Sequence, residues 1–342
     1  MTIFTLPGTV TNAVTHFALY GLAAIYDHET GAHPRVSWSN ERQPRALLDI
    51  GDSTSQSLAR AVHQHACRHS KPDSWIQHTH QHEGRPTATF SPRIKTPSSN
   101  ESWTALQHAR HQTLDALHPV HGHLDWQMIG ALGEPAYWRT DGNEPRPDEG
   151  ASRWEMKTRN QGEEFVGQRL APLADAVAAR TVDQVLSGLL GETVTDESGK
   201  NSPKSRTATG LSRPGPVDNA LAWCALWGIS QFPVVHRLNR QSATAGTHVP
   251  GRRAAPASVF VPVPVQPLSM ARMRNVLASQ HLAVAGANSR ELETQAARKW
   301  LSVRGIRALI TFPVRVTDNP TAPERYLLDG MPTILETTAG TY

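Results

Sequence analysis

The stretch ALAWCALWGISQFPV, residues 220–234, carries the strongest fold signal in the chain. It holds no charged residue and follows Asp218, a residue type that caps helix N-termini. Its glycine, Gly228, suits a helix C-terminus, and Pro233 cannot continue a helix. The pattern therefore predicts a buried helix over 217–229 that leads into an extended segment.

Further helices and strands are predicted from hydrophobic periodicity. Apolar residues recur at helical spacing in HFALYGLAAI (16–25). Residues 163–190 are expected to form one or two helices, with a break or kink at Pro172. Pro262 and Pro264 predict an edge strand or an extended arm, because proline donates no ladder hydrogen bond. We expect helices at 12–26, 163–190 and 290–303, and strands at 258–266 and 306–316.

Polar stretches rich in glycine, proline and serine divide the chain. We expect an irregular loop at 83–100, a linker at 139–152 and an exposed loop at 195–217. The expected fold class is therefore α+β, with mixed helices and short strands, two domains and long exposed loops. Its N-terminal domain would be 1–138, including a histidine-rich region, and its basic C-terminal domain 153–342.

Composition limits the class of protein. Of the 342 residues 38% are hydrophobic, enough for a large core, and the two cysteines are too few for a disulfide framework. The N-terminus has no signal-peptide pattern, and the apolar stretches 13–26 and 220–235 are too short or too polar to span a bilayer. We therefore expect a soluble cytoplasmic protein without a membrane partner.

The net charge of +4 is unevenly distributed. Residues 1–199 carry 17 Lys/Arg against 23 Asp/Glu, whereas residues 200–316 carry 16 Lys/Arg against three acids. Such a basic segment is typical of proteins that bind phosphate-rich partners. Neutralisation by the acidic half within the fold is the alternative explanation.

A run of histidines is the most conspicuous candidate for metal chemistry. His63, His65, Cys67 and His69 are spaced for one or two helix faces, and His78, His80 and His82 would share one side of a strand. The spacing matches no closed zinc pattern, so a solvated histidine-rich surface is the simpler interpretation. His121, His123 and Asp125 suggest a metal or nuclease site only weakly. We expect no catalytic residues, no metal and no cofactor.

Basic residues beside turns and apolar anchors are the better candidates, as contacts to phosphates or base edges. The predicted nucleic-acid-binding residues are Lys157, Arg159, Asn160, Gln161, Arg169, Arg237, Arg240, Arg252, Arg253, Arg272 and Arg274. An ordinary capping turn is the alternative for Lys157–Gln161. Trp75, Trp103 and Trp154 could stack on bases, although core packing is the simpler explanation.

The segments HFALYGLAAI, RNQGEEFVGQRL and ALAWCALWGISQFPV, with the proline-containing arm and short basic helix that follow, resemble one known family. They are similar to the large-subunit proteins of type I CRISPR surveillance complexes, most of all the compact type I-U/I-G group. The resemblance covers about half of the chain, mainly 12–26 and 153–315, and rests on no invariant catalytic motif. Many large subunits are longer and end in a helical bundle, whereas we expect no such bundle after the second Phe-Pro-Val segment, residues 312–314.

The resemblance implies a non-catalytic, antiviral, RNA- and DNA-binding scaffold. Its partners would be a guide RNA, target DNA, backbone and small subunits of the ribonucleoprotein (Cascade-like) complex, and a helicase-nuclease. The family reads a short motif beside the target, while RNA–DNA pairing supplies the sequence specificity. Two alternatives stay open: a metal-dependent hydrolase or nuclease using the His63–His82 tract, and an interaction protein whose basic half binds an acidic partner.

Overall fold

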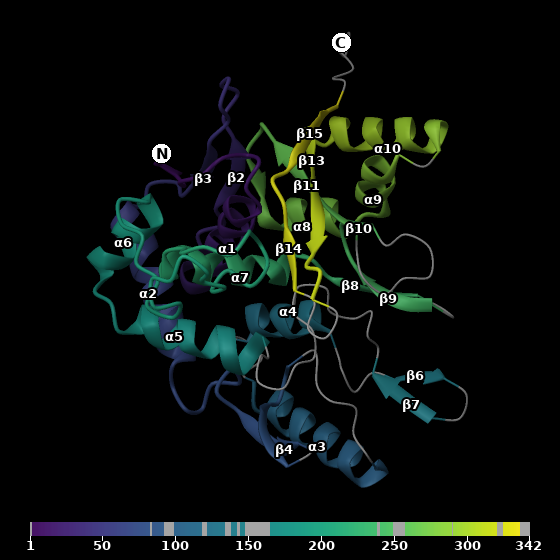
Figure 1. Ribbon diagram of the computed structural model, residues 1–342. Coiled ribbons are helices and arrows are strands. Elements are labelled where there is room, and N and C mark those ends of the chain that lie inside the picture. Colours follow the sequence, from purple (N-terminus) through teal and green to yellow (C-terminus); the bar gives the residue numbers. More distant parts are fainter. Residues whose placement is uncertain are drawn as a thin grey trace.

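The computed structural model confirms the α+β class: helices pack against several small antiparallel sheets (Figure 1). It describes residues 2–82, 84–91, 99–117, 122–133, 138–141, 144–147, 165–237, 240–248, 257–288, 290–319 and 324–335.

Two helices far apart in sequence form the centre of the molecule. α1 (Ala13–Thr30) is buried along most of its length and packs against α7 (Asn219–Gly228). The backbones touch at glycines: a Cβ on Gly21 would lie 1.8 Å from the Cys224 carbonyl oxygen, and one on Gly228 would lie 2.1 Å from the Phe17 carbonyl oxygen. The predicted helices over 12–26 and 217–229 are confirmed, and the Asp218 carboxylate caps α7 by accepting from the Ala220 N–H.

A group of helices covers one side of this pair. It consists of α2 (Ser55–His69), the π-helical turn η1 (Val166–Leu170), α5 (Ala171–Ala178) and α6 (Val182–Leu190). Pro172 marks the predicted irregularity but not a helix end: the π-helical turn η1 comes directly before the turn that holds Pro172 and runs on into α5. The helical region breaks instead before Thr181, which starts α6 with a capping box shared with Gln184.

One sheet contains strands from the N-terminal and the C-terminal half of the chain. Its strand order is β1 (Ile3–Thr5), β3 (Ala46–Asp49), β2 (Arg35–Trp38) and β12 (Leu268–Ser269). β12 pairs antiparallel with β2, placing Ser269 opposite Arg35. A strand from the basic half of the sequence therefore completes a sheet that the N-terminal half begins.

The second large sheet is built on β13 (Ile306–Val316). β11 (Ser258–Pro264) pairs along one side of it, and β14 (Arg325–Leu327) and β15 (Met331–Ile334) pair with it as well. The short β10 (Thr247–His248) pairs only with the first two residues of β11. Pro262 and Pro264 therefore lie in the part of β11 that β10 does not pair with. The Tyr20 hydroxyl of α1 donates a hydrogen bond to the Pro262 carbonyl.

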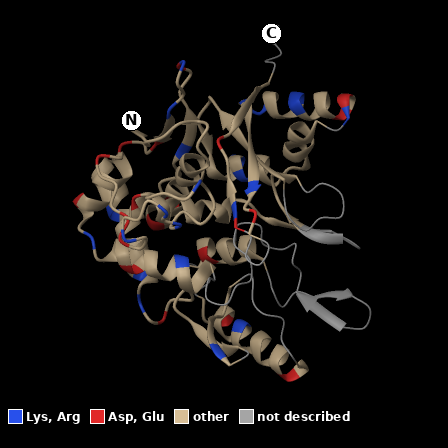
Figure 2. Ribbon diagram, in the orientation of Figure 1, with Lys and Arg blue, Asp and Glu red and all other residues tan. Residues whose placement is uncertain are grey.

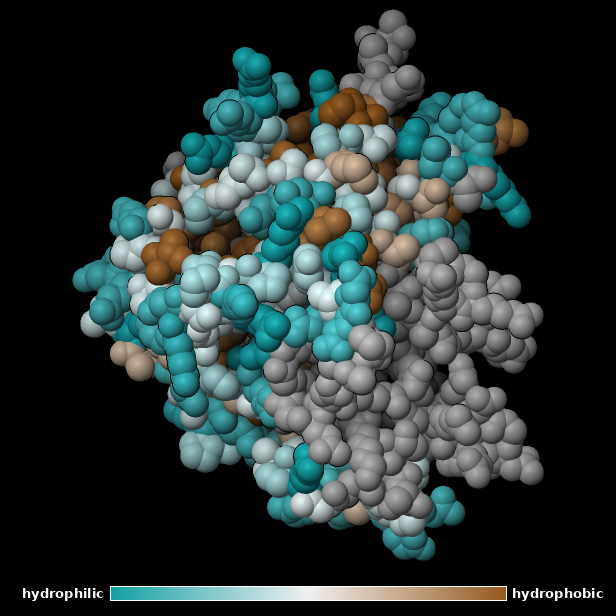
Figure 3. All heavy atoms as spheres, in the orientation of Figure 1, coloured by the Kyte–Doolittle hydropathy of each residue, from teal (hydrophilic) through white to brown (hydrophobic). Residues whose placement is uncertain are grey.

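The remaining helices flank these sheets and the central pair. They are α3 (Asn100–Ala116), α4 (His123–Leu132), the short 3-10 turn η2 (Ile229–Gln231), α8 (Met270–Ala278), α9 (Gln280–Ala287) and α10 (Glu291–Val303). α10 confirms the helix predicted over 290–303. β15 carries two exposed apolar side chains, Met331 and Ile334. On the face shown in Figure 3, apolar atoms gather near the upper end of the molecule.

Three two-stranded antiparallel hairpins complete the architecture of the described residues. They are β4 (Thr79–His82) with β5 (Arg85–Ala88), β6 (Trp138–Asp141) with β7 (Glu144–Pro147), and β8 (Val234–Arg237) with β9 (Arg240–Thr244). The expected loop at 83–100 and linker at 139–152 therefore contain strands. Residues 92–98, 142–143 and 148–152 lie outside the described residues.

The segment 195–217 contains no helix or strand, but it is not an exposed loop throughout. Asp196 is fully buried, and its carboxylate accepts hydrogen bonds from the Gly199 N–H, the Thr207 hydroxyl and the Asn219 amide. Leu211 is buried as well. The polar residues that suggested an exposed loop satisfy one another inside the fold.

A buried arginine ties the same segment to α7. The Arg180 guanidinium donates to Asp218 at 2.8 Å and to both carboxylate oxygens of Glu197 at 2.9 and 2.6 Å. It also donates to the Thr195 carbonyl at 2.6 Å. Arg180 thus links the start of α6 to the cap of α7.

The two segments expected to form separate domains share one hydrophobic core. Buried residues from Phe4 to Leu335 belong to a single contiguous cluster that contains both α1 and α7. The expected boundary at 139–152 therefore does not separate two cores. In the described part of the chain, no helix is long and apolar enough to cross a membrane.

Candidate nucleic-acid interface

A concave site lies where the start of α8 meets the end of α10, and we call it the α8–α10 pocket. Its volume is about 310 Å³, within the range of small-ligand sites. The lining residues are Gln266, Leu268, Arg272, Asn275, Val276, Val303 and Arg304.

α8 places three of these side chains on one face. The helix begins after Ser269, whose hydroxyl caps it by accepting from the Arg272 N–H at 3.4 Å. Arg272, Asn275 and Val276 then follow at spacings of three and four residues, which share a helix face. Val276 is buried and packs into the core, so the polar Arg272 and Asn275 are held at the surface.

α10 supplies the other arginine. Arg304 caps the C-terminus of α10, where a positive charge is favourable, and its Nη1 donates to the Trp300 carbonyl at 3.1 Å. Its guanidinium lies over the Trp300 ring at 3.6 Å from the centroid, and the His281 ring lies 4.6 Å from that centroid. This cation–π contact restricts the orientation of Arg304 at the pocket.

The pocket is positively charged because two arginines and no acidic residue line it. Among the described residues, neither Arg272 nor Arg304 forms an ion pair, and both are exposed. The acids of α10, Glu291 and Glu293, lie at its opposite end (Figure 2). Two exposed guanidinium groups without a carboxylate partner are suited to holding phosphate oxygens.

Of the two predicted arginines on α8, only Arg272 reaches the pocket. Arg274 turns into the fold, where its Nε and Nη2 donate to the Gln231 side chain at 3.2 and 3.0 Å. Burial lowers the pKa of Arg274, against the opposing attraction of Asp27. Residues two apart on a helix point about 200° apart, so the two arginines cannot form one surface as expected.

No other described residue of the predicted set lines this pocket. Arg169 lies half-buried in η1, and Arg237 is paired in register with Arg240 across the β8–β9 hairpin, whose arginine side chains lie outside the described atoms. The remaining six, Lys157, Arg159, Asn160, Gln161, Arg252 and Arg253, lie outside the described residues, as does Trp154. Trp75 and Trp103 are buried in the core rather than available for stacking.

Three polar residues of the pocket were not predicted as site residues: Gln266, Asn275 and Arg304. Asn275 directly follows the predicted Arg274 in sequence, and only the phase of α8 places Asn275 at the pocket while Arg274 turns into the fold. Arg304 carried a usable signal, since it follows Trp300 by one helical turn and stands at a helix C-terminus. Gln266 had none.

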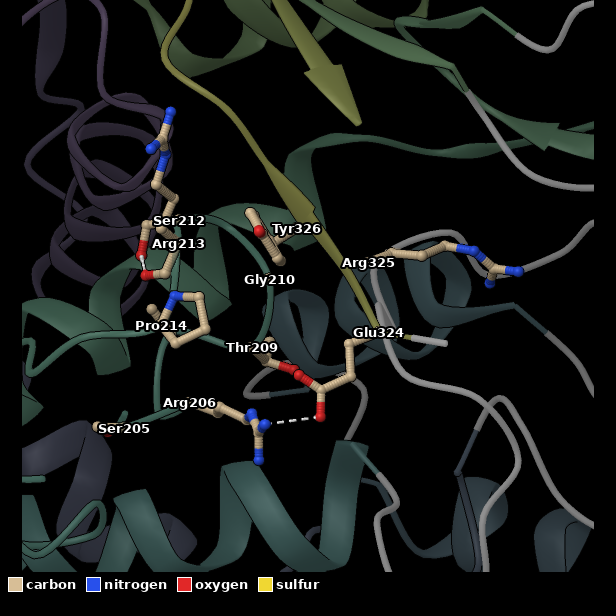
Figure 4. A pocket seen from close by; sticks show the side chains of 11 residues that line it. Ser205, Arg206, Thr209, Gly210, Ser212, Arg213, Pro214, Glu324, Arg325 and Tyr326 are labelled. Carbon is tan, nitrogen blue, oxygen red and sulfur yellow. Dashed lines mark hydrogen bonds and ion pairs between the residues drawn. The ribbon is translucent and has the colours of Figure 1, made fainter. Parts of the chain in front are cut away.

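A second, narrower pocket lies between residues 205–214 and β14 (Figure 4). Arg206 pairs with Glu324 at 2.7 Å across it, and Arg213 lies 3.9 Å from Asp329. Its free volume is about 20 Å³, room for a water molecule. Because its arginines face acids and it is narrow, it is the weaker candidate.

The histidines of α2 point in two directions. His65 faces the core, where its Nδ1 accepts from the Trp223 indole at 3.1 Å, and burial followed by repulsion from His69 keeps its pKa well below the ordinary value. His63 instead contacts α5, donating to the Ala178 carbonyl at 3.3 Å. Cys67 accompanies His63, with 3.6 Å between its Sγ and the His63 Nε2.

The later histidines lie elsewhere. His80 and His82 are neighbours on β4, with ring centroids 5.6 Å apart, while His78 precedes the strand and contacts Thr113 of α3. The predicted row of three imidazoles on one strand is therefore reduced to two. Within the described residues, no group of three or more His, Cys, Asp or Glu side chains is placed to hold a metal ion.

Asp125, considered above as part of a metal site, is a buried partner of α2. Its Oδ1 lies 3.2 Å from the His69 Nε2, and the His69 Nδ1 lies 2.9 Å from the Ser74 hydroxyl. Burial acts to raise the pKa of Asp125, but the attraction and hydrogen bond of His69 outweigh it, so this pKa lies below its ordinary value. The pair fastens α4 to α2.

The chain matches no protein-family model, no curated protein and no solved structure. The α8–α10 pocket and the distribution of charge are therefore the observations that bear on function.

Proposed function

We propose that this protein is a non-catalytic, nucleic-acid-binding subunit of a CRISPR RNA-guided surveillance complex, acting in the cytoplasm. The acid-free α8–α10 pocket carries the proposal. It lies within the strongly basic segment 200–316. Its two arginines form no ion pair among the described residues, and they offer the forked donors that bind phosphate bidentately.

The assignment to a guide-RNA complex adds what the family resemblance implies. In that setting the protein binds guide RNA and target DNA beside backbone and small subunits, helps to read a motif next to the target, and recruits a helicase-nuclease. The pocket supports the part of this role that requires contact with phosphates.

The alternative of a metal-dependent hydrolase gains no support from the geometry. Its proposed ligands diverge, since His65 faces the tryptophans of α7, His63 faces α5, and His80 lies on the β4–β5 hairpin. We therefore keep the binding function as the single proposal.

Co-purification tests the complex. The tagged protein is isolated from its native cells, and the bound nucleic acid and proteins are identified. A discrete guide-length RNA with further subunits is the expected result. Protein that elutes alone and free of nucleic acid would contradict the proposal.

Charge reversal tests the pocket. We expect Arg272→Glu with Arg304→Glu to weaken binding of RNA or DNA to the purified chain at fixed salt by about tenfold or more, because two charge-assisted contacts are lost. The matched control is Arg42→Glu with Arg45→Glu, which makes the same charge change at two exposed arginines outside the pocket. Equal weakening in both pairs would mean that overall charge, rather than the pocket, governs binding.

A further inference from the structure

The α8–α10 pocket offers more than a phosphate requires. Beside its two arginines stand two exposed amides, Gln266 and Asn275, and the buried Leu268 and Val276 give it an apolar wall. A contact to the phosphate backbone alone would use the arginines and leave the amides and the apolar wall without a partner.

The amides and the apolar wall match a nucleobase. A carboxamide presents a donor and an acceptor side by side, which is the arrangement needed to pair with the edge of a base. Aliphatic side chains favour the flat face of a base over water. With a volume of about 310 Å³, the pocket has room for a group that enters it rather than merely touching its rim.

A base inside a duplex is stacked and paired, so it reaches a pocket only after leaving the helix. We infer that the α8–α10 pocket binds one unstacked nucleobase of a single strand, with the flanking phosphates on Arg272 and Arg304. The inference rests on the proposed nucleic-acid binding and names its substrate class.

The stacking of Arg304 on Trp300 fits this role. The tryptophan occupies one face of the guanidinium at 3.6 Å, and one Nη1 hydrogen bond goes to the helix end. The position of the guanidinium is therefore set before a strand arrives, which lowers the entropy lost on binding.

The experiment measures the affinity of the full chain for a short single strand and for its duplex, by fluorescence anisotropy at one salt concentration. We expect the single strand to bind about tenfold more tightly, since insertion and stacking of one base contribute on this scale. Asn275→Phe fills the pocket without changing charge and should abolish the preference while leaving the salt dependence unchanged. Gln295→Phe, on the exposed face of α10, is the matched control and should behave as wild type.

The outcomes separate the two proposals. Failure to bind either nucleic acid would overturn the proposed function. Equal affinity for single strand and duplex, unaffected by Asn275→Phe, would overturn the base pocket and leave the nucleic-acid binding intact. If Asn275→Phe does not fold, Val303→Trp fills the pocket from α10 at a side chain that is 70% exposed, and the same comparison applies.

Discussion

Replacing Gly21 by alanine tests the contact on which the fold depends. A Cβ there would lie 1.8 Å from the Cys224 carbonyl oxygen and 2.6 Å from the Gly228 nitrogen, both backbone atoms of α7. Ordinary van der Waals contact begins at 3.4 Å, so α1 and α7 would have to separate by about 1.6 Å. Neither atom belongs to a flexible side chain that could move aside.

The expected cost is large because the helices separate along a buried interface. Overpacking in a core costs about 1–3 kcal/mol, and a clash between backbones exceeds the upper end, so we expect a loss of about 3–5 kcal/mol of unfolding free energy. That loss is a substantial fraction of the roughly 5–15 kcal/mol that stabilises a typical protein. Urea unfolding followed by tryptophan fluorescence measures it.

Gly130→Ala is the matched control. Gly130 lies within α4, where an added Cβ meets nothing within 4 Å, so we expect a gain of up to about 1 kcal/mol from helix propensity. Gly228→Ala should resemble Gly21→Ala, because its Cβ would lie 2.1 Å from the Phe17 carbonyl oxygen. If the free energy of unfolding of Gly21→Ala lies within about 1 kcal/mol of the wild-type value, as for tolerated changes, the close packing of α1 on α7 is refuted.

Other predictions concern buried polar groups. Burial lowers the pKa of His16 to about 4, although its hydrogen bond to the Val10 carbonyl opposes the shift, so the unfolded chain takes up a proton between pH 6.5 and 4 that the folded chain does not. The free energy of unfolding is therefore unaffected by His16 above pH 6.5 and falls by about 2 kcal/mol by pH 5. His16→Gln should reduce this dependence of the unfolding free energy on pH, measured by urea titration. An unchanged dependence would show that other groups cause it. Arg180→Gln should cost about 3–5 kcal/mol because it leaves the buried Asp218 carboxylate without its cation. Arg206→Gln breaks an ion pair whose side chains are 42% and 26% exposed and should cost under about 1 kcal/mol. Similar losses in thermal or urea unfolding for these two arginine variants would contradict the burial of the Arg180 network. Asp125→Asn should lower the free energy of unfolding at pH 7 more than at pH 3. The reason is that the ionised carboxylate, which pairs with His69, is protonated as the pH falls through its lowered pKa. An equal loss at both pH values would show that the charge of Asp125 does not stabilise the fold.

The sequence predicted most reliably what is decided locally. The helices α1, α7 and α10 and the strands β11 and β13 were found, because apolar spacing and the Asp218 cap act within a few residues. Pro172 coincides with a change from π-helical to α-helical hydrogen bonding rather than with a helix end, and the sequence alone does not distinguish these two outcomes.

The candidate site was predicted only in part for a related reason. Arg272 and Arg274 are equivalent in sequence, and the phase of α8 against the core decides that one faces the pocket and the other Gln231. Likewise, Asp196 became a buried acceptor because partners along 199–219 fold around it, which composition does not reveal.

The sequence by itself determined the α+β class, the main helices and the basic character of residues 200–316, since these depend on short-range periodicity and on composition. Only the tertiary structure decided that Gly21 meets α7, that both halves share one core, and that Arg272 and Arg304 enclose one pocket. Each of these depends on segments far apart in the chain. Their juxtaposition is fixed by the packing of the whole core and the pairing of β12 with β2 and β11 with β13, which no local pattern encodes.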